Sequence, residues 1–202
     1  MLYITKSGHV DAERIKIMIF STIERGTLER VNGIVVHQTG GPTAESAFNS
    51  YRNTGANGAH FLIDKDGSIY QTASLYKVTN HVGKAKSRCV VTKKCDSTEF
   101  KRMNALEKAW KPAEISKTEY EKRFPDRFPV NSDAIRIEIV GKANRIPGQR
   151  DEVYEPVTEQ QNASLKWLVR ELADTLGVSM SEVYRHPEVA RKTPSEASTA
   201  KW

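Results

Sequence analysis

Two histidines, a strand glutamate and a lysine are the side chains whose types and positions suit hydrolytic chemistry. His37 ends a short β-branched run just before a glycine-rich turn, where side chains commonly emerge into a pocket. Glu138 lies in an isoleucine-rich stretch, where a buried carboxylate must be paired, bound to metal or protonated. His186 lies in a polar segment, and Lys192 follows it. With one further carboxylate as a ligand, this set suits a zinc site in which a second carboxylate takes the proton of a metal-activated water.

Strands are predicted around the first two of these residues. The β-branched run 34–37 is typical of a buried strand. The stretch 134–140 alternates, with its isoleucines on one face and Glu138 on the other. Two apolar runs joined by Asp-Lys-Asp-Gly predict a hairpin within residues 59–71.

Helices are predicted between these strands. Residues 11–31 are interpreted as a short helix and turn, and residues 46–52 as a helix. Thr158 and Gln161 form a capping box for a leucine-rich helix that Gly177 ends. Strands interleaved with helices indicate an α/β fold: a single domain with a central mixed β-sheet flanked by helices.

Residues 84–130 differ in composition from the rest of the chain. They are rich in lysine and glutamate and hold both cysteines. We expect them to form a helical, partly loop-like insertion on the surface of one domain that spans residues 1–202. Cys89 and Cys95 have no neighbouring Cys or His that would complete a zinc knuckle, so they favour a short local disulfide.

Composition excludes several classes of protein. The chain has 202 residues, enough for a domain with its own hydrophobic core. No stretch approaches the roughly 18 to 20 apolar residues of a membrane-spanning helix.

Lys and Arg number 31 against 25 Asp and Glu, a net charge of +6. The cations are scattered among acids, which disfavours nucleic acid as a partner. The N-terminal residues lack the charged and apolar regions of a secretory signal.

Five segments, in order, resemble the type 2 N-acetylmuramoyl-L-alanine amidases, which include peptidoglycan recognition proteins, phage lysozyme-type amidases and bacterial cell-wall recycling amidases. The segments are Ile34–Thr39, His60–Gln71, Asn80–Gly83, Ala134–Ile139 and His186–Lys192. The resemblance implies the fold of that family and zinc-dependent cleavage of one amide in peptidoglycan. That amide joins the lactyl group of muramic acid to the L-alanine of the stem peptide.

The resemblance also implies roles for individual residues. His37 and His186 match two zinc ligands. Glu138 matches the general base of the recycling branch, and Lys192 matches the lysine that stabilises the oxyanion in the phage branch. The phage branch has a catalytic tyrosine at the position of Ala59, which favours Glu138 as the base here.

The third zinc ligand departs from the family pattern. The phage and recognition-protein branches have a cysteine where this chain has Pro194, which offers no ligand atom. The recycling branch has an aspartate where this chain has Glu196. We expect Glu196 to be the third ligand because carboxylates are ordinary zinc ligands. Ser195 is the weaker candidate.

Three further residues are candidates for contacts with the substrate. His81 matches a histidine of the family's Trp-His-x-Gly loop, although the tryptophan is Asn80 here. Thr39 is expected to line the same cleft, or else to be an ordinary turn residue. His60 lies on a predicted strand, where a core or supporting histidine is the more common role.

The segment from Lys192 to the end is most similar to secretion-associated bacterial amidases. We therefore expect a type VI secretion antibacterial effector, made in the cytoplasm without a signal peptide and delivered to a target cell's periplasm. A periplasmic destination agrees with a Cys89–Cys95 disulfide. The expected partners are peptidoglycan and a cognate acidic immunity protein. The alternatives are a non-catalytic peptidoglycan-binding module, a phage endolysin and a cytosolic muropeptide-recycling amidase.

Overall fold

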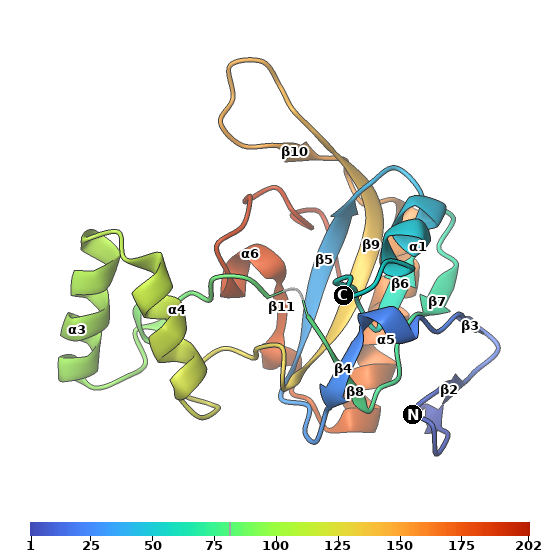
Figure 1. Cartoon of the computed structure of the whole chain (residues 1–202), viewed down its shortest axis with the longest axis horizontal. Helices are drawn as coiled ribbons and strands as arrows, with labels where there is room; N and C mark the ends of the chain where they lie inside the picture. Colours follow the sequence, from blue (N-terminus) through green and yellow to red (C-terminus); the bar gives the residue numbers. More distant parts are fainter. Residues whose placement is uncertain (81) are drawn as a thin grey trace.

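A mixed β-sheet runs through the centre of the computed structural model, which describes residues 1–80 and 82–202 (Figure 1). The strands of this sheet are β3 (Ile15–Ile17), β5 (Gly33–Gly40), β6 (Phe61–Ile63), β7 (Ile69–Gln71), β9 (Ala134–Asn144), β10 (Val153–Tyr154) and β11 (Val183–Arg185). They lie in the order β11–β5–β9–β6–β7–β3, and β10 pairs with β9. β5 is parallel to β11 and to β9, whereas β6 is antiparallel to β7.

Helix α5 (Glu159–Leu176) covers one face of this sheet and lies behind it in Figure 1. The predicted capping box is confirmed, because Thr158 accepts a hydrogen bond from the Gln161 backbone and the Gln161 side chain accepts one from the Thr158 backbone. Gly177 ends the helix with a φ of 68°, a conformation that favours glycine. The buried leucines of α5 share one core cluster with the isoleucines of β9. The predicted α/β fold, a central mixed sheet flanked by helices, is therefore confirmed.

Helix α1 (Ala44–Tyr51) packs on the opposite face of the sheet. The Thr43 side chain caps it by accepting a hydrogen bond from the backbone of its first turn. This cap places the start of the helix two residues earlier than the predicted range 46–52. Phe48 and Tyr51 lie on its buried side, in a cluster with residues of β6 and β9.

Strands β5 and β9 set the position of the first two candidate residues. Their parallel register places His37 opposite Glu138. Side chains alternate between the faces of a sheet, so paired residues of neighbouring strands emerge on the same face. The predicted alternation of β9 is confirmed: its isoleucines lie in the core under α5, whereas Val140, two residues from Glu138, packs with α1.

The predicted hairpin is confirmed in β6 and β7. The two strands are antiparallel, and the backbone of Gly67 donates a hydrogen bond of 2.9 Å to the Asp64 carbonyl across the turn. Gly67 adopts a φ of 84°, which a side chain would disfavour.

The prediction of a short helix and turn over residues 11–31 is wrong. This segment contains short strands joined by turns and coil, and its only helical part is a single 3₁₀ turn, Ser21–Ile23. The strands of the N-terminal region and their partners outside the main sheet are β1 (Tyr3–Ile4), β2 (Val10–Asp11), β4 (Glu24–Thr27) and β8 (Lys77–Thr79). Long-range pairing explains the difference, because β3 lies beside β7 and β4 beside β8. Local patterning carries no information about such partners.

Residues 84–130, called the insertion below, contain helices α2 (Arg88–Thr92), α3 (Ser97–Lys108) and α4 (Pro112–Glu121). They lie to one side of the sheet, at the left of Figure 1. Cys89 and Cys95 form a disulfide with Cα atoms 5.4 Å apart. Among the described residues, no helix has both the length and the apolar character that crossing a bilayer requires.

Candidate active site

Two neighbouring parallel strands bring the two candidate histidines together. His37 lies near the end of β5, and His186 begins helix α6 (His186–Val189) directly after β11. Because β11 pairs with β5 in parallel, with Arg185 opposite Val36, both histidines reach the same edge of the sheet. Their rings lie 4.0 Å apart between centroids, and both side chains are buried.

Glu196 completes a group of three possible metal ligands. Its Oε1 atom lies 2.9 Å from Nδ1 of His186 and 3.4 Å from Nδ1 of His37. One donor atom from each of the three residues lies within 4.8 Å of the others, and all three residues are buried. The structure thus brings together the ligand set that the resemblance implied. Two imidazoles and one carboxylate leave a fourth position open, the donor set of a catalytic zinc site.

Ionisation of these groups also fits a divalent cation. Burial lowers the pKa of His37 to about 3 and lowers that of His186. For Glu196, burial alone would raise the pKa, but hydrogen bonds to His186 and His37 outweigh it and lower the pKa to about 2. The group therefore presents neutral imidazoles and an anionic carboxylate near neutral pH, the forms that bind metal.

Gln38 holds the Glu196 segment against β5. Its side-chain oxygen accepts a hydrogen bond of 2.8 Å from the backbone of Ala197, and its side-chain nitrogen donates one of 2.9 Å to the carbonyl of Glu155. Sequence reasoning missed this residue, although it directly follows His37. Because neighbouring residues of a strand point to opposite faces, Gln38 does not share the face of His37. It contacts the Glu196 segment only because residues 194–200 pass along its side of the sheet.

The weaker alternative for the third ligand, Ser195, is engaged elsewhere. Its hydroxyl donates a hydrogen bond of 2.7 Å to the carbonyl of Glu152 and accepts one from the backbone of Tyr154. Both partners belong to the segment that forms β10. Ser195 therefore fastens its loop to β10, and Glu196 is the residue that lies beside the histidines.

Glu138 faces a cavity of about 300 Å³ on the α1 side of the sheet. Thr39, Gly41 and Tyr51 are among its lining residues. Burial raises the pKa of Glu138 to about 6, against the hydrogen bond from Tyr51, which lowers it. A carboxylate with a pKa close to the working pH suits a general base.

Tyr51 is a second residue that sequence reasoning missed. Its hydroxyl donates a hydrogen bond of 2.7 Å to Oε2 of Glu138, and its side chain is buried. In the sequence it is only the second aromatic residue of an amphipathic helix, a pattern equally typical of a core residue. The contact joins α1 to β9 and fixes the direction of the carboxylate.

We expect Tyr51→Phe to shift the acidic limb of the pH–rate profile to higher pH. The lost hydrogen bond stabilises the ionised form of Glu138, so its removal raises the pKa of that carboxyl. Turnover should fall roughly threefold to tenfold at pH 6 and much less at pH 8. Tyr70→Phe is the control, because its hydroxyl has no hydrogen bond among the described residues. An equal loss of turnover at pH 6 and pH 8 would contradict a role of Tyr51 in setting the pKa of Glu138.

Lys192 is an exposed residue of the loop that follows α6. Burial raises the pKa of Glu138, and the positive charge of Lys192 opposes this rise in part. Burial lowers the pKa of His186, and the charge of Lys192 adds to this effect. The structure thus places this charge near the candidate ligands and the candidate base.

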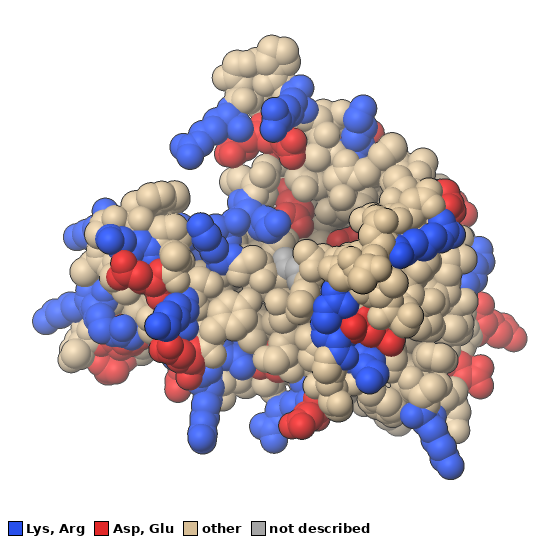
Figure 2. All heavy atoms as spheres, in the orientation of Figure 1, with Lys and Arg blue, Asp and Glu red and all other residues tan. Residues whose placement is uncertain are grey.

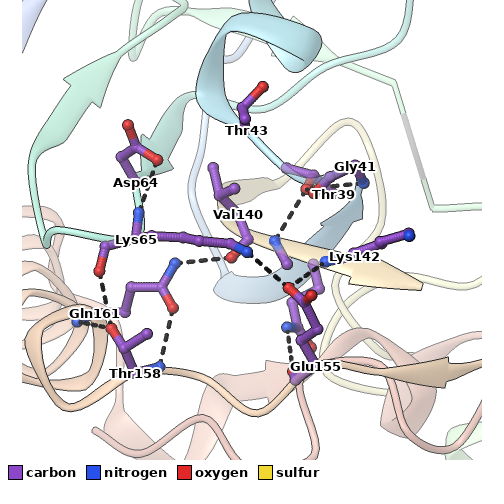
Figure 3. Close-up of polar contacts among 12 residues, drawn as sticks. Thr39, Gly41, Thr43, Asp64, Lys65, Val140, Lys142, Glu155, Thr158 and Gln161 are labelled. Atoms are coloured by element: carbon purple, nitrogen blue, oxygen red, sulfur yellow. Dashed lines mark hydrogen bonds and ion pairs between the residues drawn. The ribbon is translucent and has the colours of Figure 1, made fainter. Parts of the chain in front are cut away.

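Thr39 lines the cavity and also shapes its wall. Its hydroxyl accepts hydrogen bonds from the backbones of Gly41 and Gly141, at 3.3 and 3.2 Å, and donates one to the Gly41 carbonyl. These bonds hold the turn between β5 and α1 against β9 (Figure 3). Among the other candidates for substrate contacts, His81 lies outside the described residues.

Figure 3 also shows a polar network at the carboxyl end of β9. Lys65 forms an ion pair of 2.8 Å with Glu155, which accepts a hydrogen bond from the backbone of Lys142. The side chain of Gln161 donates one of 2.8 Å to the Val140 carbonyl. The network ties the strand that carries the candidate base to the β6–β7 turn and to the start of α5.

His60 is a core residue and not a contact for the substrate. It has no exposed surface, Nδ1 accepts a hydrogen bond from the backbone of Arg136, and Nε2 bonds to the carbonyl of Lys77. Burial, with the nearby charge of Arg136, lowers its pKa to about 3. Of the two roles considered for His60, this burial supports the core role, between β6 and β9, over a contact with the substrate.

This buried histidine predicts a pH dependence of stability. In the unfolded chain, His60 binds a proton when the pH falls below its ordinary pKa of 6.5. In the folded chain, His60 binds this proton only near pH 3. The free energy of unfolding should therefore decrease as the pH falls, by about 1.4 kcal/mol per unit for this one group. Urea denaturation of the wild type and of His60→Gln, both in chelator, should show a shallower pH dependence in the variant. An equal change of unfolding free energy with pH in both proteins would contradict the assignment of His60 as a buried neutral histidine.

The model of the N-acetylmuramoyl-L-alanine amidase family, Amidase_2, matches residues 27–199. The match includes both candidate histidines, Glu138 and Glu196. The chain therefore belongs to this family and to the enzyme class of N-acetylmuramoyl-L-alanine amidases. No curated protein sequence matches it.

Two solved structures, of AmpD and AmiA, show the same fold, and a third is similar at a lower score. A selenomethionine derivative of AmpD is 17% identical, with a TM-score of 0.54 over 96% of this chain and 94% of that one. Staphylococcus aureus hydrolase AmiA in complex with its ligand is 14% identical, with a TM-score of 0.51 over 88% and 67%. The amidase LysC from Clostridium intestinale URNW is 20% identical, with a TM-score of 0.49 over 88% and 85%.

Proposed function

We propose that this chain is a zinc-dependent amidase that hydrolyses the bond between N-acetylmuramic acid and the L-alanine of the stem peptide in peptidoglycan. The observation that carries the proposal is the convergence of His37, His186 and Glu196 in one buried group. Glu138, opposite His37 on the neighbouring strand, supplies a separate carboxylate for proton transfer. Membership of the amidase family supports the substrate class.

His37, His186 and Glu196 would hold the zinc ion. When bound, zinc supplies Lewis-acid polarisation of the amide carbonyl and lowers the pKa of a water. Glu138 accepts the proton of the attacking water and returns it to the alanine nitrogen as the C–N bond breaks. Tyr51 orients the Glu138 carboxylate for both transfers. The ammonium group of Lys192 stabilises the negative charge that develops on the carbonyl oxygen.

Digestion of purified sacculi tests this proposal. The purified protein should release soluble peptides whose new amino terminus is L-alanine, identified by mass spectrometry. A chelator should abolish release, and added zinc should restore it. Retention on sacculi without release would instead indicate a binding module. Release of sugar fragments would show cleavage of a different bond.

We propose in addition that the enzyme is a type VI secretion effector that acts in the periplasm of a target cell. The Cys89–Cys95 disulfide supports an oxidising place of action. The net charge of +6 supports an acidic immunity protein as partner.

Expression in a Gram-negative host with an added export signal should cause lysis, and expression without one should not. Deleting the gene from a donor strain with a type VI apparatus should reduce killing of competitors. Unchanged killing would contradict this route and leave the endolysin and recycling alternatives.

A further inference from the structure

The insertion is joined closely to the loop that carries Lys192. The backbone of Arg191 donates a hydrogen bond to the carbonyl of Lys84, and the backbone of Lys86 donates one to that of Val189, both at 2.9 Å. The Arg191 side chain forms an ion pair with Glu107 of α3. These contacts place the insertion directly beside the segment between the two candidate ligands His186 and Glu196.

A cavity of about 540 Å³ opens at this junction, and we call it the basic groove. Its lining residues include Lys86, Trp110, Arg150, Asp151, Arg191 and Lys192. Figure 2 shows Lys and Arg side chains on both sides of the hollow between the insertion, at the left, and the β9–β10 loop, at the top. Of the described residues, four cations and a single acid line the groove.

Two of the groove's cations are available to a ligand. Among the described residues, neither Arg150 nor Lys192 forms an ion pair, whereas Arg191 is paired with Glu107. Lys192 lines the groove and lies in the segment between the candidate ligands His186 and Glu196, so the groove adjoins the candidate active site. An anionic ligand in the groove would therefore lie beside the bond that is cleaved.

Trp110 adds an aromatic surface to this groove. It follows α3, adopts a φ of 50°, and its side chain is 66% exposed. The guanidinium of Arg191 stacks on its ring at 5.0 Å from the centroid. A large exposed aromatic side chain held by a cation is a common feature of binding surfaces.

We propose that the basic groove binds the stem peptide through its free carboxylates, with Trp110 packing on the peptide. This inference rests on the proposed function. In the amide-linked substrate the lactyl carboxyl of muramic acid is consumed and the N-acetyl sugars are neutral, so the free carboxylates belong to the peptide. Among the residues that the structure describes, no Lys or Arg lines the cavity on the other side, around Glu138 and Thr39. Charge therefore assigns the peptide to the insertion side and the glycan to the α1 side.

A binding experiment that does not depend on turnover tests this assignment. Zinc-loaded full-length protein is titrated with a synthetic stem peptide that begins with L-alanine and carries free carboxylates, and with the same peptide after amidation. Tryptophan fluorescence and calorimetry report binding. Amidation should weaken binding about tenfold, the contribution of one charge-assisted hydrogen bond.

Matched variants locate the effect. Arg150→Gln should reduce the preference for the acidic peptide, and Trp110→Ala should weaken both peptides alike. Lys101→Gln, which removes an exposed cation from α3 outside the groove, should leave the preference unchanged. Equal binding of both peptides, or equal effects of Arg150→Gln and Lys101→Gln, would overturn the proposal. So would displacement of the acidic peptide by a short DNA duplex at equal concentration, since that would show a general polyanion surface.

Failure of this inference differs from failure of the proposed function. If the groove assignment is wrong, peptides are still released from sacculi, but the acidic and amidated peptides bind alike. If the amidase assignment is wrong, nothing is released from sacculi, and the preference of the groove for free carboxylates is still measured.

Discussion

Glu138→Gln should lower kcat for peptide release about a hundredfold to ten-thousandfold, the usual contribution of general acid–base catalysis. Glutamine keeps the shape of the side chain and can still accept the hydrogen bond from Tyr51. It cannot accept a proton from the attacking water. Zinc content should stay at the wild-type value, because Glu138 lies outside the three-residue ligand group. Activity is measured on labelled sacculi and zinc by atomic absorption.

Glu45→Gln is the control for this prediction. Glu45 is an exposed carboxylate on α1, and its substitution should leave kcat unchanged. Turnover by Glu138→Gln at the wild-type rate would show that another group takes the proton. Loss of zinc from Glu138→Gln would show that the carboxylate is a ligand and not a base.

Glu196→Ala should weaken zinc binding by more than about a hundredfold. Removal of a residue that only supports a metal ligand commonly lowers metal affinity tenfold to a hundredfold. Glu196 lies in the ligand group itself, so its removal should lower zinc affinity further. Peptide release should disappear at limiting zinc. His37→Ala and His186→Ala should behave in the same way. Competition with a fluorescent zinc chelator gives the affinity.

Ser195→Ala separates the two residues that the sequence offered as third ligand. The Ser195 hydroxyl bonds to the segment of β10, so its loss should change loop stability and leave zinc affinity near that of the wild type. A variant Glu196→Ala that retained one tightly bound zinc would refute the ligand assignment. A large loss of affinity in Ser195→Ala alone would assign the role to serine.

The arrangement of the site follows from ordinary features of a parallel sheet. β11, β5 and β9 run side by side in one direction, so residues late in β5 and just after β11 meet at one edge. The ligands His37 and His186 come from this edge, and Glu138 comes from the strand beside it. Such an edge is a common place for functional groups in α/β folds, because loops can converge there around a rigid frame.

Several elements could be predicted because their signals are local. The alternation of residues 134–140, the hairpin within 59–71 and the capping box at Thr158 each depend on residues close together in the chain. Residues 11–31 could not be predicted in this way. Their strands form by pairing with β7 and β8, which lie about fifty residues further along the chain.

The amino-acid sequence by itself determined which side chains can do chemistry here: two histidines, a glutamate in an apolar strand, and a carboxylate where the family pattern has a ligand. Only the tertiary structure decided that Glu196 and not Ser195 lies beside both imidazoles, that Tyr51 bonds to Glu138, and that His60 is buried in the core. The physical reason is distance. Periodicity and caps act within a few residues, whereas a ligand group depends on the packing of strands and loops more than a hundred residues apart.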